Sequence, residues 1–169
     1  MKIARRALLP LLLSGCGFHP LYGPRGDGPG VSAELAQIQV GLIPERSGQL
    51  LRESLRTRFE RGGTAIAPRY DLNIIYAISS DGVAIQRDNS TSRVRILARA
   101  SWALSAQDAK RTQLATGTAQ LVDGFNVFVN QYFAADLERE AAERRMSDAV
   151  AEDITLQVAA WFDRQKPAG

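Results

Sequence analysis

Three arginines lie at odd-numbered positions of one predicted strand, and a fourth precedes them across a turn. They are Arg93, Arg95 and Arg99, preceded by Arg87. Because successive side chains of a strand point to opposite faces of a sheet, the first three guanidinium groups lie on one side. A guanidinium fork matches the oxygens of a phosphate or carboxylate group. The spacing therefore predicts an anion-binding face, or a solvated face whose arginines pair with acids on neighbouring strands.

A second group of residues with specific chemistry is Leu13-Ser14-Gly15-Cys16. It follows a basic segment that contains Lys2, Arg5 and Arg6, and an apolar run over residues 7–13. That run is far short of the roughly 20 apolar residues that span a bilayer, so the segment has the layout of a secretory signal. The four residues have the pattern of a lipobox, in which small residues admit the chain to a signal peptidase and the thiol accepts a diacylglycerol.

Cleavage before Cys16 would remove residues 1–15 and free the cysteine amine for a further acyl chain. One acyl chain anchors a protein only marginally, because each buried methylene contributes about 0.8 kcal/mol, whereas two or more anchor it stably. We therefore predict a covalent diacylglycerol and an N-acyl chain on Cys16, and no cofactor. The alternatives are a plain secretory signal followed by a chance cysteine, or a free core thiol.

The composition excludes several classes of protein. The 169 residues are 45% hydrophobic and 23% charged, which is typical of one globular domain with a real core. The chain has a net charge of +3, but the predicted leader holds three of its 21 basic residues, which leaves 18 against 18 acidic residues. This balance argues against a nucleic-acid partner. One cysteine and one histidine exclude a disulfide framework and are too few for a Cys/His metal site.

Sequence motifs of enzymes are not found. The single histidine, His19, lies in a segment rich in glycine and proline and cannot serve a Ser-His-Asp arrangement in the folded domain. The chain has no HExxH, Walker A or GxGxxG pattern in its structural context. A hydrolase with two catalytic carboxylates stays open as an alternative, because spacing alone does not remove it. We predict no catalytic residue and no metal site.

The remaining pattern predicts a flexible tether over 16–33 and a single domain over 34–166. Alternating apolar residues predict strands over 34–43, 70–79, 92–105 and 112–123. Apolar stripes predict helices over 48–61 and 133–164. Residues 83–87 either continue the second strand past a bend at Asp81-Gly82 or form a short strand. This order predicts an α+β fold with two layers, in which a four-stranded mixed sheet carries two helices on one face.

Two local features accompany these elements. Ser47 is the predicted N-cap of the first helix, and Gly62-Gly63 is its predicted end. Residues 124–130 are predicted to form a loop before the second helix. The aromatic residues of this region are either core, with one or two rings left outside, or an exposed patch for a partner. The candidates for that patch are Phe125, Phe128 and Tyr132.

The segment CGFHPLYG, residues 16–23, follows the lipobox directly and resembles the start of the mature LptE lipoproteins, which assemble lipopolysaccharide. The resemblance is greatest to the alphaproteobacterial branch of that family. The stretch from Phe125 through Gln131-Tyr132-Phe133-Ala134, with a following helix that ends in Trp161-Phe162, is also similar to that branch. The order of strands and helices resembles the family as well.

The resemblance implies a lipid-anchored protein at the periplasmic face of the outer membrane. Such a protein plugs and helps to assemble the large β-barrel LptD, takes part in lipopolysaccharide insertion into the outer leaflet, and binds lipopolysaccharide. Under this reading the side of the strand that carries Arg93, Arg95 and Arg99, the arginine face, meets lipopolysaccharide phosphate, an acidic barrel wall, or solvent. The alternative is an auxiliary lipoprotein of another envelope machine, such as a lipid-transport ABC system or a secretin pilot.

Overall fold

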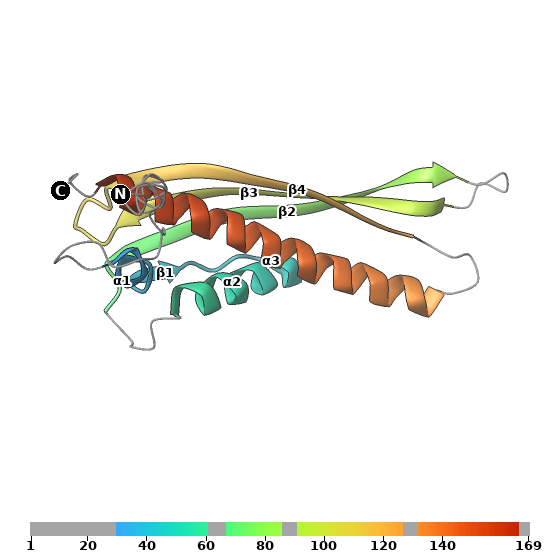
Figure 1. Ribbon diagram of the computed structural model, residues 1–169, viewed down its shortest axis with the longest axis horizontal. Helices are drawn as coiled ribbons and strands as arrows, with labels where there is room; N and C mark the ends of the chain where they lie inside the picture. The colour runs from blue at the N-terminus through green and yellow to red at the C-terminus, as the bar shows by residue number, and fades with distance from the viewer. Residues whose placement is uncertain (1–29, 61–66, 86–90, 127–131, 166–169) are drawn as a thin grey trace, which may run out of the picture.

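The computed structural model describes residues 30–60, 67–85, 91–126 and 132–165. Their elements follow in the order α1 (Val31–Leu35), β1 (Ile38–Val40), α2 (Glu45–Phe59), β2 (Tyr70–Ile85), β3 (Thr91–Ala106), β4 (Gln113–Asn126) and α3 (Tyr132–Gln165). A four-stranded sheet forms one layer, and α2 and α3 run along one face of it (Figure 1). The predicted α+β fold is confirmed.

The sheet is mixed, as predicted, and three of its strands are long. The strand order is β1-β2-β3-β4, with β1 parallel to β2 and the other pairs antiparallel. The α2 segment supplies the crossover that a parallel pair requires. Strands β2 and β3 have 16 residues each, and therefore span roughly 50 Å. The register shifts between Gly82 and Ile85, so residues 83–85 continue β2 past a bulge.

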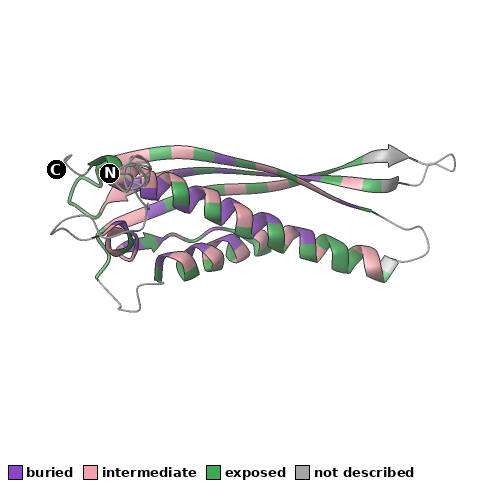
Figure 2. Ribbon diagram, viewed as in Figure 1, coloured by how far each residue is buried: buried purple, intermediate pink, exposed green. Residues whose placement is uncertain are grey.

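The two faces of the sheet differ sharply. On β3, the residues that face the helices are buried from Ile96 through Leu104 at every second position. The alternate positions point to the opposite face, which no helix of the described residues covers (Figure 1). The apolar stripes of α2 and α3 complete the core between the layers (Figure 2). Their large side chains that are fully or nearly fully buried are Leu51, Leu55, Phe59, Met146, Val150, Ile154 and Val158.

Polar contacts join the two long helices at the edge of this core. Arg58 donates to the Asp148 carboxylate at 2.7 Å, and the Ser54 hydroxyl donates to the same carboxylate oxygen at 2.6 Å. Arg46, at the start of α2, pairs with Glu140 on α3. These contacts hold α2 and α3 side by side below the sheet.

The strand predicted over 34–43 is wrong at both ends. Val31 and Leu35, spaced one helical turn apart, are buried on the short helix α1. Only residues 38–40 pair with β2, and Leu42, which strict alternation would put on the same face as the buried Ile38 and Val40, is 86% exposed. The alternating pattern therefore corresponds to a strand only over residues 38–40; the residues before it include the end of α1, and those after it form a loop.

The predicted start of the first long helix is also wrong. Helix α2 begins at Glu45 after the N-cap Pro44, without a side-chain cap, and Ser47 lies inside its first turn. Gly48 is buried there, and a Cβ at this position would lie only 2.6 Å from Ile43 Cγ2, so a larger residue does not fit without a shift. The helix ends at Phe59, and the predicted stop at Gly62-Gly63 lies outside the described residues.

Candidate functional site

The arginine face lies on the uncovered side of β3. Arg93, Arg95 and Arg99 are all exposed. Arg95 Nη2 lies 3.7 Å from Asp81 Oδ2, and both side chains are more than half exposed, so this ion pair is weak. Among the described residues, no acid forms an ion pair with Arg93 or Arg99. Most of the positive charge on this face is therefore available to a ligand or a partner.

A hollow of about 350 Å³ lies between two of these arginines and the end of β4; its lining residues are Arg93, Arg95, Val122, Asp123 and Gly124. We call it the arginine hollow. Gly124 pairs with Arg95 across the strands and has no side chain to fill the space. A Cβ at Gly124 would lie 2.9 Å from the Val94 carbonyl oxygen, so the backbone itself disfavours any larger residue there.

The backbone of Asp123 lines this hollow, but its carboxylate lies on the helix-covered side of the sheet, because Asp123 pairs with the inward-facing Ile96 and bonds to α3. Asp123 Oδ2 accepts a hydrogen bond from Arg145 Nη2 of α3 at 2.9 Å, and its other oxygen accepts from the Gly124 backbone N–H at 2.7 Å. The Asp123 carboxylate thus has partners other than Arg93 and Arg95. Two guanidinium groups beside an open space are suited to bind an anion with several oxygens, such as a phosphate.

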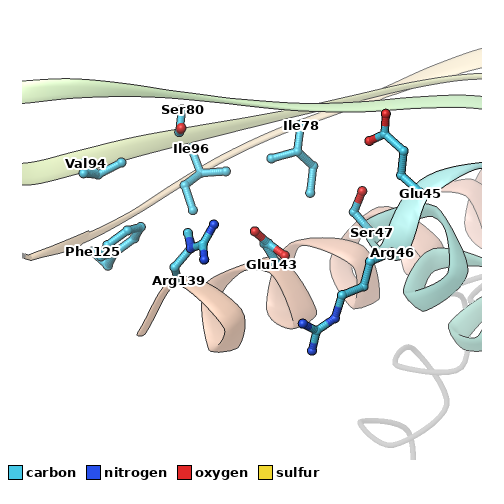
Figure 3. A pocket seen from close by; sticks show the side chains of 10 residues that line it. All are labelled: Glu45, Arg46, Ser47, Ile78, Ser80, Val94, Ile96, Phe125, Arg139 and Glu143. Carbon is cyan, nitrogen blue, oxygen red and sulfur yellow. The ribbon is translucent and has the colours of Figure 1, made fainter. Parts of the chain in front are cut away.

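A larger groove lies on the other face of the sheet, between the strands and α3 (Figure 3). Its volume is about 430 Å³. The strands contribute an apolar wall, and the two helices contribute mainly charged side chains, so we call it the amphipathic groove. The apolar residues are Ile78, Val94, Ile96 and Phe125; the polar ones are Glu45, Arg46, Ser47, Ser80, Arg139 and Glu143.

The groove exists because α3 changes character toward its N-terminus. Ala142 and Met146 still pack into the core, whereas Arg139 and Glu143 point from the helix toward the strands (Figure 3). At the rim, Glu140 binds both Arg144 and Arg46. The hydrogen bond from Arg144, together with the charge of Arg46, lowers the pKa of the Glu140 carboxyl below its ordinary value. That carboxylate therefore stays charged through the neutral range and holds Arg46 at the rim.

The two hollows lie on opposite faces of the same strand ends. Val94 lines the amphipathic groove, while Arg93 and Arg95 on either side of it line the arginine hollow. Similarly, Phe125 lines the groove, and its neighbour Gly124 lines the hollow. This arrangement follows from the alternation of side chains along β3 and β4.

Of the two alternatives for the aromatic residues, the described side chains agree with core packing that leaves one ring outside. Phe125 lies in β4, which continues through Asn126 where a loop was predicted, and it is buried in the core. Phe128 and Arg87 lie outside the described residues, and Tyr132 begins α3 with a side chain that is not described. Among the side chains that the structure describes in this region, Phe133 is 90% exposed, and Leu137, one turn later, is 67% exposed. Their spacing by four residues was the available signal for a second apolar side of this helix.

The lipobox residues Leu13, Ser14, Gly15 and Cys16 lie outside the described residues. Within the described part of the chain, no helix is both long enough and apolar enough to cross a membrane. The same residues contain no group of three or more His, Cys, Asp or Glu side chains that could hold a metal ion.

A protein-family model described as LptE, lipopolysaccharide-assembly, matches residues 35–158, well over half of the chain. The chain belongs to the LptE family. A search of the curated proteins gave no match. Members of the LptE family are envelope lipoproteins of lipopolysaccharide assembly, which agrees with the resemblance carried by residues 16–23.

Solved structures of lipoproteins share the fold. A lipoprotein from Caulobacter crescentus CB15 is 24% identical, with a TM-score of 0.63 over 82% of this chain and 98% of that one. Rare lipoprotein B from Shewanella oneidensis is 14% identical, with a TM-score of 0.55 over 76% of this chain and 97% of that one. A minor lipoprotein from Acinetobacter baumannii is also 14% identical, with a TM-score of 0.52 over 74% and 92% of the respective chains.

Proposed function

We propose that this LptE-family protein is anchored by lipid at the periplasmic face of the outer membrane. There it occupies the lumen of an LptD-like β-barrel, helps that barrel to assemble, and takes part in inserting lipopolysaccharide into the outer leaflet. The observation that carries the proposal is the family match over residues 35–158. The long, narrow arrangement of strands and helices is compatible with a domain that enters a barrel (Figure 1).

Direct contact with lipopolysaccharide is part of the proposal, and the arginine hollow is its proposed place. Arg93 and Arg95 border an open space of about 350 Å³, and Asp123 is held by Arg145. Lipid A carries phosphates in most bacteria, and guanidinium groups bind phosphate oxygens through paired hydrogen bonds. Arg99 continues the same face and would meet either the ligand or an acidic part of the barrel wall.

The anchor gives a first prediction. Cys16→Ala removes the acylated thiol, so the domain is expected to fold unchanged and to move from the membrane fraction to the periplasmic fraction. The measurement is fractionation of cells that lack the barrel partner, followed by circular dichroism of the soluble form. A Cys16→Ala protein that stays integral to the membrane without a partner would contradict the proposed anchor.

The partner gives a second prediction. A C-terminally tagged chain is expected to retain a large β-barrel in stoichiometric amount when it is purified from detergent-solubilised outer membranes. Mass spectrometry identifies the co-purified protein, and a band that unfolds only on heating in detergent marks it as a barrel. Recovery of an inner-membrane transporter or a secretin in its place would support the alternative, an auxiliary lipoprotein of another envelope machine.

A further inference from the structure

We propose that the amphipathic groove holds one acyl chain of the same lipopolysaccharide molecule whose phosphate is bound in the arginine hollow. This inference deepens the proposed function and rests on it for the identity of the lipid. It assigns a ligand to the face of the sheet opposite the arginines.

The lining of the groove favours an apolar chain. Three strands contribute Ile78, Val94, Ile96 and Phe125, and the only hydroxyl on that wall belongs to Ser80. An acyl chain needs no hydrogen-bond partner along its length, and it removes apolar surface from water when it lies on such a wall. The volume of about 430 Å³ falls in the range of roughly 300–1,000 Å³ that is usual for ligand sites.

The charged side of the groove is balanced, with Glu45 and Glu143 against Arg46 and Arg139, so the preference for an anionic head comes from the neighbouring arginine hollow. Arg139 points from α3 toward the strands, and its contact with Asp136 is a long one of 3.4 Å between exposed side chains. Arg93 and Arg95 add two further positive groups on the other face of the same strand ends. A neutral lipid would use none of these charges, whereas a phosphorylated one complements them.

The two hollows are close enough in the sheet to serve one molecule. β4 is the last strand of the sheet, so a single strand, about 5 Å wide, separates the arginines of β3 from the open edge. Gly124 and Phe125 are consecutive residues of that strand, one in each hollow. A lipid whose phosphate and acyl chains branch from one sugar head could straddle this edge.

The test uses the full lipidated chain in the outer membrane of a Gram-negative host, with the lipopolysaccharide of that host as the probe. A photoreactive p-benzoylphenylalanine replaces Ser80, which lines the groove and is exposed. A second chain carries it in place of Val122 in the arginine hollow. The matched control replaces Ser101, an exposed serine on the uncovered face of β3, about 20 Å from Arg95 along the strand.

After irradiation, we expect lipopolysaccharide adducts at positions 80 and 122 and none at position 101. Mild alkali cleaves ester-linked acyl chains from the sugar, so the peptide that contains position 80 should keep the mass of a fatty acid. The double variant Arg93→Glu/Arg95→Glu should lose the adduct at position 80, because the head of the same molecule is no longer held.

The outcomes separate the two proposals. An adduct at 122 without one at 80 overturns the acyl-chain site and leaves the arginine hollow as the lipopolysaccharide contact. An adduct at 80 without one at 122 removes the assignment to the arginines and overturns the proposal that one molecule occupies both hollows. A phospholipid adduct at 80 overturns the groove as a site for a lipopolysaccharide acyl chain. Absence of any adduct at both positions overturns both proposals.

Discussion

Reversing the charge of the arginine hollow with Arg93→Glu/Arg95→Glu is expected to weaken lipopolysaccharide binding by about 100-fold. Hydrogen bonds to charged groups contribute about 1.5–3 kcal/mol each, and the loss of two of them at the lower end of this range corresponds to roughly two decades in the dissociation constant. The melting temperature should change little, because both side chains are exposed and only Arg95 has an ion pair, a weak one, among the described residues. Lipopolysaccharide binding is measured by titration of the purified protein in detergent.

A matched variant separates a specific contact from a general charge effect. Arg56→Glu/Arg111→Glu changes the net charge equally, and both arginines are exposed and lie outside the two hollows. We expect this control to bind lipopolysaccharide as the unmodified chain does, apart from a small uniform loss. Equal weakening in both double variants would show that only the total charge matters. Unchanged binding in Arg93→Glu/Arg95→Glu would assign the arginine face to solvent or to the barrel wall.

The second large effect is expected on stability, from Trp102→Ala. The Trp102 ring lies on the inner face of the sheet, near the end of β3, and is only 5% exposed. Its Nε1 donates to Gln157 Oε1 at 3.1 Å, and Gln157 Nε2 donates to the Thr118 carbonyl at 3.0 Å. Removal of a buried tryptophan typically costs 3–5 kcal/mol, roughly a 10 °C or greater loss in melting temperature for a domain of this size. Thermal unfolding followed by circular dichroism measures this change.

Two further substitutions separate packing from hydrogen bonding at this position. Trp102→Phe keeps a ring but leaves Gln157 Oε1 without its donor, so we expect a loss of about 1–3 kcal/mol. Gly117→Ala would place a Cβ 2.6 Å from the Trp102 ring and destabilise by overpacking, by about 1–3 kcal/mol. A cost below about 1 kcal/mol for Trp102→Ala would mean that the ring is not packed as described.

Much of the fold could be predicted from local patterns. β3 was predicted over 92–105 and is Thr91–Ala106, and α3 was predicted over 133–164 and is Tyr132–Gln165. Both elements are long enough to repeat their apolar period several times, so a single residue that departs from the pattern does not hide it. The three-residue strand β1 and the five-residue helix α1 are too short for such repetition. β1 forms because it pairs with β2, and α1 is held because Val31 and Leu35 pack into the core.

Parts of the candidate site depend on residues that are distant along the chain. The alternation of side chains along one strand was enough to predict that Arg93, Arg95 and Arg99 point to the same face of the sheet. That Gly124 lies opposite Arg95 depends on the register of β3 and β4, and that Arg145 neutralises Asp123 depends on how α3 crosses the sheet. Neither relation has a signature in local spacing, because register and helix placement are set by packing of the whole core.

The sequence by itself determined the predicted anchor and the class of fold. The proposed lipobox is four consecutive residues, and the alternating and helical periods of the long elements are likewise local properties of the chain. The amphipathic groove, the burial of Phe125 and the exposure of Phe133 were decided by tertiary structure alone. Whether an apolar side chain is covered depends on which surface reaches it, and only the packing of α3 against the sheet settles that.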